Sequence, residues 1–211
     1  MTTILLIRHG ENDMMKKGRL AGRTPGVHLN DEGRAHAQLL ADVLAPKLAQ
    51  AREEGKLRGI FSSPMERTQE TAAPLAAALG QPIVIRPGLI ETDCGSWSGK
   101  TLKGLSRLKL WRTVQQSPSL FCFPGGESFT DIQQRIVGEI EVLRSGFTDA
   151  KDLALCFSHA DPIKLAVAYY LNMPLDAFQR LVINPTSITG LFFEGEAVRL
   201  LMLNQGLPEK A

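Results

Sequence analysis

His9 and His159 each come directly after a short, mostly aliphatic run that is typical of a buried strand. In an open parallel sheet, ligands bind outside the carboxyl ends of the strands. We therefore expect both imidazoles to face one crevice, where a neutral ring nitrogen can act as a nucleophile or a hydrogen-bonding group. The other two histidines, His28 and His36, have no such position, and we interpret them as structural.

Two arginines belong to the same expected edge of the sheet. Arg8 precedes His9. Arg67 lies in the first turn of a helix expected to begin at Pro64, just past a strand expected at 59–62. One arginine guanidinium can bind two phosphate oxygens at once. A helix N-terminus adds backbone N–H donors and the positive end of the helix dipole. Two arginines and two histidines at strand ends therefore predict a site for a dianion.

Motif-like stretches extend this pattern over most of the chain. In order they are Leu6-Ile7-Arg8-His9-Gly10-Glu11, Ser62-Ser63-Pro64-Met65-Glu66-Arg67-Thr68 with Thr71-Ala72, Leu89-Ile90-Glu91 with Gly95, Trp97 and Gly99, Phe123-Pro124-Gly125-Gly126-Glu127-Ser128, Ser158-His159-Ala160-Asp161-Pro162-Ile163, and Asn184-Pro185-Thr186-Ser187-Ile188. This ordered set resembles the motifs of the histidine phosphatase superfamily, the phosphoglycerate-mutase-like proteins. Its first motif, Arg-His-Gly, is highly specific.

The resemblance implies a phosphohistidine enzyme that needs no cofactor and no metal. His9 would be the nucleophile that carries the phosphoryl group, and its imidazole must be neutral to attack phosphorus. Arg8 and Arg67 would hold the non-bridging oxygens, and their positive field should disfavour the imidazolium form of His9. His159 would be a further phosphate donor, and the sequence leaves its protonation open.

The leaving alcohol needs a proton, and Glu91 matches the general-acid position of the family. A glutamate can hold a proton near neutral pH only if its pKa is raised. Asp93 and Glu11 are nearby in the sequence and stay as alternatives for this role.

Some positions depart from the family pattern. Relatives often carry Ser or Thr directly after Arg-His-Gly-Glu, where this chain has Asn12, and an Asn where it has Met15. We predict that Asn12 and Arg23 contribute to phosphate or substrate binding. Asp161 stands where relatives commonly have glycine, and we expect it to cap the following helix, with an acid role as the alternative.

Cations are concentrated in two stretches of a chain whose net charge is only +2. Residues 14–29 hold four and residues 94–126 hold five, and neither stretch contains Asp or Glu. Both should rim the crevice, so we expect a small substrate with more than one negative group. Solvated helix faces are the alternative interpretation.

The elements that must position these residues alternate between strands and helices. Strands are expected at 3–7, 59–62, 82–85, 152–157, 188–193 and 197–203, and helices at 30–55, 64–79, 101–116, 128–144 and after His159. This alternation predicts an α/β fold, a three-layer α/β/α sandwich with a mainly parallel sheet. We expect one phosphoglycerate-mutase-like domain over 1–211 with a cap insertion at about 90–126.

Local signals set the boundaries of several helices. Asn30 should cap the first, and Pro46 should kink or break it. Ser63, Pro64 and Glu66 have the spacing of an N-cap, first helical position and capping box. Within 101–116, the residues at every third position should form one packed side, and they are Leu102, Leu105, Leu108 and Trp111. Phe121 and Phe123 are either core residues or an apolar wall for the leaving group.

Composition excludes several classes of protein. The chain has 211 residues, of which 44% are hydrophobic and 22% charged, as in ordinary globular proteins. The small net charge disfavours binding to nucleic acid or to a membrane surface, and the short N-terminal apolar run favours a cytoplasmic location. The three cysteines fit neither a disulfide framework nor a zinc site, and we expect them to be buried. Residues 188–203 could supply an exposed edge strand for a homodimer.

The expected reaction is hydrolysis of a phosphomonoester, with a small phosphorylated metabolite as substrate and inorganic phosphate as product. The short insertion favours hydrolysis over phosphoglycerate mutase-type transfer, which is the first alternative. The second is a non-catalytic module that binds phosphate or a phosphoprotein.

Overall fold

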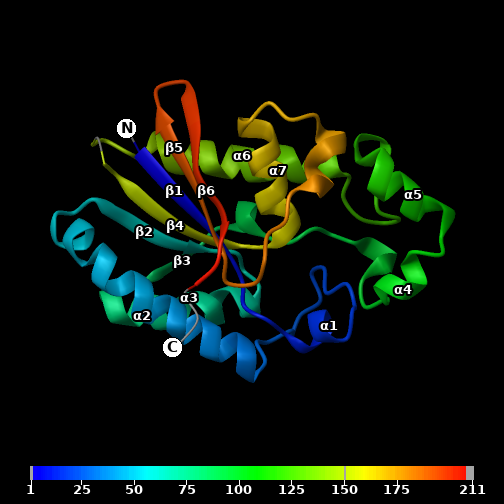
Figure 1. Ribbon diagram of the computed structural model, residues 1–211, viewed down its shortest axis with the longest axis horizontal. Helices are drawn as coiled ribbons and strands as arrows, with labels where there is room; N and C mark the ends of the chain where they lie inside the picture. Colours follow the sequence, from blue (N-terminus) through cyan, green and yellow to red (C-terminus); the bar gives the residue numbers. More distant parts are fainter. Residues whose placement is uncertain (1, 150, 208–211) are drawn as a thin grey trace.

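The centre of the molecule is a six-stranded sheet, seen in a computed structural model that describes residues 2–149 and 151–207 (Figure 1). Its strands are β1 (Thr2–Arg8), β2 (Leu57–Ser62), β3 (Ile83–Ile85), β4 (Leu153–Ser158), β5 (Ile188–Glu194) and β6 (Ala197–Gln205). They lie in the order β3-β2-β4-β1-β5-β6. The first four in this order are parallel, and β5 is antiparallel to both β1 and β6. The predicted mainly parallel sheet is confirmed.

Alternating side chains on the strands separate two cores. Leu5 and Ile7 of β1 face α2 and α3, whereas Ile4 and Leu6 face α6 and α7. The bounds of these helices are Asp31–Glu53 for α2, Glu66–Leu79 for α3, Phe129–Ser145 for α6 and Ala160–Tyr170 for α7. Figure 1 shows the two helix pairs on opposite faces of the sheet, which confirms the three-layer sandwich.

Helix α2 begins as its sequence predicts but is not interrupted at its internal proline. The Asn30 side chain caps it, as predicted, by accepting a hydrogen bond from the Gly33 amide at 2.8 Å. Pro46 was expected to kink or break this helix. It does not break it, because α2 runs without interruption from Asp31 to Glu53.

Helix α3 begins later than expected. Its first residue is Glu66, with Met65 rather than Ser63 as N-cap. The Glu66 carboxylate accepts from the Gly26 amide across the loop, and the Ser63 hydroxyl contacts His159, so the expected capping box does not form. Glu66 therefore fixes the loop at Gly26, and Ser63 fixes the side chain of His159, which follows β4.

The 90–126 segment lies at one end of the sheet and carries two short helices, α4 (Leu102–Leu105) and α5 (Lys109–Gln116), with 3₁₀ turns at Gly95–Trp97 and Pro118–Leu120 (Figure 1). A third apolar cluster anchors it to α6 and contains Trp97, Phe121, Phe123 and Phe129. Phe121 and Phe123 are therefore core residues.

One helix with a single packed side was expected over 101–116, and this prediction is wrong. Leu105 is buried, but Leu102 and Leu108 are exposed because the helix is interrupted between α4 and α5. The prediction of three buried cysteines is also wrong at one position: Cys94 and Cys156 are buried, whereas Cys122 is exposed. In the part of the chain that the structure describes, no helix is both long and apolar enough to cross a membrane.

Candidate active site

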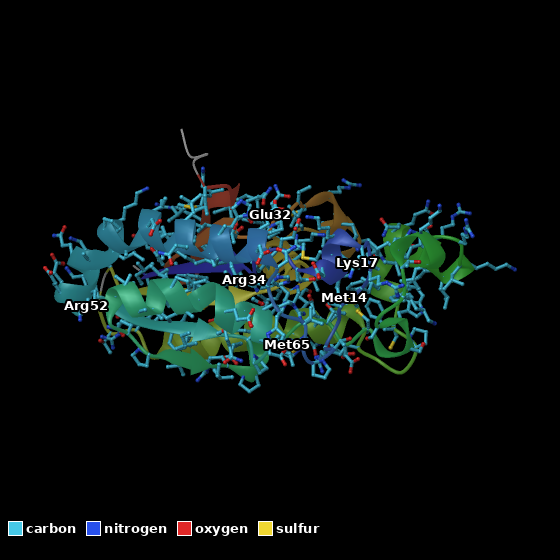
Figure 2. The ribbon with its side chains drawn as sticks, turned by 90° about the horizontal axis from the view of Figure 1, so that it is seen from below. Met14, Lys17, Glu32, Arg34, Arg52 and Met65 are labelled. Atoms are coloured by element: carbon cyan, nitrogen blue, oxygen red, sulfur yellow. The ribbon has the colours of Figure 1, made fainter. Side chains whose placement is uncertain are left out.

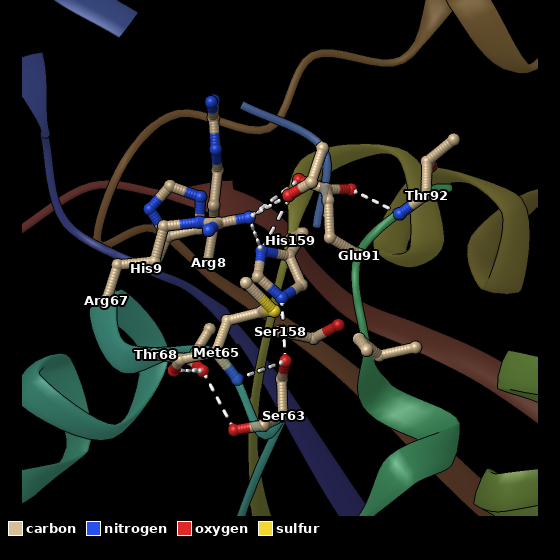
Figure 3. A network of polar contacts seen from close by, with 12 residues as sticks. Arg8, His9, Ser63, Met65, Arg67, Thr68, Glu91, Thr92, Ser158 and His159 are labelled. Atoms are coloured by element: carbon tan, nitrogen blue, oxygen red, sulfur yellow. Dashed lines mark hydrogen bonds and ion pairs between the residues drawn. The ribbon is translucent and has the colours of Figure 1, made fainter. Parts of the chain in front are cut away.

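Three strand ends bring the expected residues to one edge of the sheet. The His9 amide donates to the Ser158 carbonyl at 3.0 Å, which ties the end of β1 to the end of β4. The Ser63 amide donates to the Phe157 carbonyl at 3.0 Å and ties in the end of β2. The first histidine, the second histidine and the α3 arginine thus meet where the parallel strands terminate (Figure 3).

His9 is 3% exposed, and its ring is held in one orientation. Its Nδ1 lies 2.7 Å from the Gly10 carbonyl, which can only accept a hydrogen bond, so Nδ1 carries the proton and Nε2 keeps its lone pair. Burial, followed by the charges of Arg67 and Arg8, lowers the pKa of His9 well below its ordinary value. The ring is therefore neutral, with a nucleophilic nitrogen available.

The loop that carries His9 fits tightly against α2 and α3. The Gly10 amide donates to the Thr71 hydroxyl at 2.9 Å, and this hydroxyl donates to the Arg67 carbonyl at 2.6 Å. A Cβ atom at Gly33 would lie 2.1 Å from the Glu11 carbonyl oxygen. Only glycine lets α2 approach the loop this closely, so the nucleophile is positioned by backbone contacts on both sides.

Arg67 and Arg8 have more donors than partners. Arg67 is fully buried, and its Nη2 donates to the Gly22 carbonyl at 2.9 Å. Its Nε and Nη1, and Nε of Arg8, have no hydrogen-bond partner among the residues that the structure describes. Arg8 is held by the Ile183 carbonyl at 2.5 Å. Buried donors without partners beside a neutral nucleophile fit an anion with several oxygens.

His159 completes this arrangement from the other side. It is fully buried, its ring centre is 5.1 Å from that of His9, and its Nε2 lies 2.8 Å from the Ser63 hydroxyl. Burial, followed by the charge of Arg67, lowers the pKa of His159 well below its ordinary value. The protonated form that the sequence left open is therefore disfavoured in this structure, and His159 is a neutral hydrogen-bonding group.

Glu91 reaches the same cluster from the 90–126 segment. Its Oε2 is 3.4 Å from Nδ1 of His159 and 3.7 Å from Nη2 of Arg67, and its Oε1 accepts from the Thr92 amide at 2.9 Å (Figure 3). Burial raises the pKa of the Glu91 carboxyl, and Arg67 opposes the rise. A carboxyl group with a raised pKa can hold and release a proton near neutral pH.

The alternative acids have other partners. Asp93 accepts from the Gly95 amide at 2.9 Å and lies 3.7 Å from Arg23. Glu11 accepts from the Asn30 side chain at 2.7 Å. Of the three candidate acids, Glu91 is the one whose carboxylate contacts His159.

A cation is a poorer fit to this cluster than an anion. Ligand atoms of His9, Glu91 and His159 all lie within 4.8 Å of one another, a spacing that a metal ion could use. However, the guanidinium of Arg67 already lies against Glu91 and against Nδ1 of His159, at 3.3 Å from the latter. A second cation there would face this charge without compensation.

A pocket of about 290 Å³ opens over the cluster, with Arg8, His9 and Glu91 among its lining residues. Its outer wall joins two distant strips of chain, 18–20 and 99–102. The Gly99 amide donates to Leu20, the Leu20 amide to Lys100, and the Leu102 amide to Gly18, at 2.7–3.0 Å. Figure 2 shows Met14 and Lys17, next to the first strip, beside the helices of the 90–126 segment.

Comparison with known proteins agrees with these motifs and this fold. The model of the histidine phosphatase superfamily (branch 1) matches residues 4–206. The chain belongs to the histidine phosphatase superfamily.

Relatives of this family member include proteins of similar length and longer ones. A bifunctional protein of Mycobacterium tuberculosis is 31% identical over 208 residues, and the chain, 97% of which is aligned, spans about half (54%) of that relative. Phosphoserine phosphatase 1 of Hydrogenobacter thermophilus is 28% identical, with 97% of this chain and 92% of that protein covered. The solved structure of Bacillus stearothermophilus YhfR is 25% identical and superposes with a TM-score of 0.85, covering 97% of this chain and 98% of that one.

Both positions at which this histidine phosphatase family member departs from the pattern after Arg-His-Gly-Glu, Asn12 and Met15, lie at the pocket. Asn12 is fully buried; its Oδ1 caps the short helix α1 (Asp13–Lys16) by accepting from the Met15 amide at 3.0 Å. Its Nδ2 lacks a partner in the described ranges, so this amide can still donate to a ligand. Met15 lines the same pocket and places its sulfur 3.6 Å from Arg8.

Of two other expectations, one stays a prediction and one is wrong. Arg23 is not among the residues that line the pocket; its Nη2 lies 2.7 Å from the Glu127 carboxylate, its Nε donates to the Glu91 carbonyl, and its role in phosphate binding stays a prediction. Asp161 does not cap α7, because the N-cap is His159 and Asp161 is the second helical residue. Its carboxylate lines the pocket and lies 3.4 Å from Lys164.

Some contributors were missed by reasoning from the sequence. Ser63 orients His159, and Thr71 links the His9 loop to Arg67. Both belong to the stretch 62–72, which also carries Arg67. A polar residue directly after a buried strand was the available signal for Ser63.

Proposed function

We propose that this protein hydrolyses phosphomonoesters through a phosphohistidine formed on His9. The observation that carries the proposal is a neutral His9 with a free Nε2, buried beside two arginines with unpaired donors and a carboxyl group of raised pKa.

In the first step, the phosphate dianion lies against Arg8, Arg67 and Asn12. Nε2 of His9 attacks phosphorus in line with the leaving oxygen, an N–P bond forms and the P–O bond to the alcohol breaks. Protonated Glu91 gives its proton to the leaving oxygen, so an alcohol departs instead of an alkoxide. The arginines offset the charge that builds on the equatorial oxygens.

In the second step, water replaces the alcohol. The Glu91 carboxylate accepts a proton from that water as its oxygen attacks phosphorus, the N–P bond breaks, and His9 returns to its neutral form. Inorganic phosphate leaves. With Nε2 of His159 accepting from the Ser63 hydroxyl, the ring proton lies on Nδ1, and this N–H donates to the phosphoryl group.

The substrate we propose is a small metabolite with a second negative group besides the phosphate. Of the nine cations in the two basic stretches, Arg19 is the one among the described residues that lines the pocket. Its Nη1 is fixed by the Gly99 carbonyl at 2.7 Å, and its remaining donors are available. Phosphoserine, named for one relative, has this chemistry, since it carries a carboxylate.

Arg19 gives this substrate proposal its test. Replacing Arg19 with Gln should lower kcat/KM for O-phosphoserine about tenfold and that for phenyl phosphate by less than threefold, as expected for one charged contact. The exposed Arg107→Gln is the matched control from the other basic stretch. Equal losses on both substrates would exclude Arg19 as a specificity residue.

The wider organisation is part of the same proposal. We take 1–211 as one domain in which the 90–126 segment acts as a cap. We also propose a homodimer that pairs through β6, which forms one edge of the sheet. Light scattering of the purified protein checks this, and a monomeric mass at micromolar concentration would exclude it. A cytoplasmic location, and partners that include neither nucleic acid nor membrane, stay predictions.

The deciding experiment measures phosphate release from 4-nitrophenyl phosphate in the presence of EDTA, with wild type and His9→Ala. Turnover that persists in EDTA and vanishes in His9→Ala supports the proposal. Turnover that survives in His9→Ala overturns it. Absence of turnover with tight vanadate binding would favour a mutase or a binding module instead.

A further inference from the structure

Glu127, which directly precedes the N-cap residue of α6, lies between two guanidinium groups. Its Oε1 is 2.7 Å from Nη2 of Arg23 and 3.1 Å from Nε of Arg135, and its Oε2 is 3.1 Å from Nη2 of Arg135. Oε2 also accepts from the Asp93 amide at 3.0 Å. One carboxylate therefore joins the loop before α2, the helix α6 and the 90–126 segment.

Both arginines then converge on the backbone of Glu91. Nε of Arg23 donates to the Glu91 carbonyl at 2.9 Å, and Nη2 of Arg135 lies 3.4 Å from the same oxygen. Nη1 of Arg135 donates to the Ile90 carbonyl at 2.8 Å and to the Gly88 carbonyl at 2.9 Å. The chain that presents the Glu91 carboxyl group is thus held from two sides by groups that Glu127 orients.

The charges of this cluster are mutually dependent. The side chains of Glu127 and Arg135 are each 19% exposed and that of Arg23 is 31% exposed, so solvent screens them only in part. Burial would raise the pKa of Glu127, but its bonds from Arg135 and from the Asp93 amide outweigh burial and lower it. The carboxylate is therefore ionised. Without its charge, two cations would remain close together around one carbonyl.

We propose that Glu127, through Arg23 and Arg135, is a positioning residue that sets the Glu91 carboxyl group against the leaving oxygen. The inference rests on the proposed phosphatase function. Glu127 touches neither His9 nor the pocket, so it acts on the reaction only through Glu91. It also gives Arg23 a function other than the phosphate binding expected from the sequence.

The test compares two aryl phosphates whose leaving oxygens differ in basicity. 4-Nitrophenyl phosphate needs little help from an acid, whereas phenyl phosphate needs a proton on its leaving oxygen. In Glu127→Gln, kcat/KM for phenyl phosphate should fall about 10- to 100-fold, because a small displacement of a catalytic group is costly. For 4-nitrophenyl phosphate the fall should be about threefold or less. A purely structural defect would lower both values equally.

Asp152→Asn is the matched control. Asp152 is also a buried carboxylate that lies against an arginine, Arg58 at 3.6 Å, and accepts from backbone amides, those of Thr148 at 2.8 Å and Asp149 at 3.0 Å, but it directly precedes β4, at the end of this strand opposite Ser158. It should lower both rates by the same factor. The pH profile for phenyl phosphate should change shape in Glu127→Gln and keep its shape in Asp152→Asn.

Two further variants keep the proposal falsifiable. If Glu127→Gln does not fold, the more exposed Arg23→Gln must show the same selective loss. In a Glu91→Gln background, Glu127→Gln should cause no additional selective loss, since the group it positions is absent. Equal losses on both substrates, or an additional selective loss in that background, would overturn the inference. Such results leave the function itself intact, since that is decided by His9→Ala with 4-nitrophenyl phosphate.

Discussion

Replacing Arg67 with Met should make the unliganded protein more stable while removing its activity. Arg67 is fully buried, yet Nε and Nη1 have no partner within the described residues. Each unsatisfied buried donor costs about 1–3 kcal/mol. Methionine has a similar length, fills the space without polar atoms and removes this cost.

The gain is reduced by the contacts that Arg67 does make. The Gly22 carbonyl loses its hydrogen bond, and Glu91 loses the guanidinium 3.7 Å away. The first loss costs about 1 kcal/mol. The second costs little at low pH, because burial already raises the pKa of Glu91 and a protonated carboxyl group needs no cation. We expect a net gain of about 1–3 kcal/mol near pH 5, or about 3–10 °C in Tm for a chain of this size.

The sign with pH follows from the raised pKa of Glu91. Removing Arg67 raises this pKa further, so the folded state of the variant binds a proton that the unfolded state releases. The gain should therefore be largest near pH 5 and shrink towards pH 8. In a Glu91→Gln background the change with pH should be smaller, and the part that remains comes from His9 and His159, whose pKa values the Arg67 charge lowers.

Thermal unfolding of wild type and Arg67→Met, at both pH values and with added phosphate, measures these effects. Phosphate should raise the Tm of the wild type and leave that of the variant unchanged, since only the wild type binds it. Arg199→Met, at a side chain that is 67% exposed, is the control and should change Tm little. A lower Tm for Arg67→Met at both pH values would refute the argument that the unpaired donors are costly.

Other predictions follow from single contacts. Glu91→Gln should lower kcat/KM for phenyl phosphate about 10²- to 10³-fold and flatten the alkaline limb of its pH profile, because the raised pKa of Glu91 sets that limb; an unchanged limb would argue against Glu91 as the acid. Gly33→Ala should cost about 1–3 kcal/mol in urea unfolding, because the new Cβ would meet the Glu11 carbonyl at 2.1 Å. Gly138→Ala, which meets no atom within 4 Å, should be neutral or stabilising. The bond to Glu70 raises the pKa of His28, so the Tm difference between wild type and His28→Gln should be present near pH 6 and disappear above pH 8; a difference that grows with pH would contradict this.

Much of the fold could be predicted because local signals and tertiary structure agree in most elements. The strand before His9, the Asn30 cap of α2 and the Gly80 end of α3 all lie where residue types place them. The single helix expected over 101–116 does not form because helix α4 ends at Leu105 and α5 begins only at Lys109, so Leu102, Leu105 and Leu108 do not share one face of one helix.

The site was predictable in its members and less so in its contacts. Strand ends at one edge of a sheet must be close, which predicts that His9, His159 and Arg67 meet, whereas Glu91 was expected from the resemblance to the family. Neither signal indicates where a long side chain points, and Arg23 turned to Glu127 instead of the pocket. At Ser63, the helix-start rule failed because the hydroxyl is used by His159. Local rules are broken where polar groups are needed for the site.

The pairing of strips 18–20 and 99–102 has a consequence for engineering substrate preference. The outer pocket wall is one hydrogen-bonded unit made from two places that are 80 residues apart, at Arg19 and Gly99. A chimera that takes only the 90–126 segment from a relative would set a foreign strip against the native one and leave their backbone pairing mismatched. To exchange substrate specificity among these proteins, both strips therefore have to be taken from the same relative.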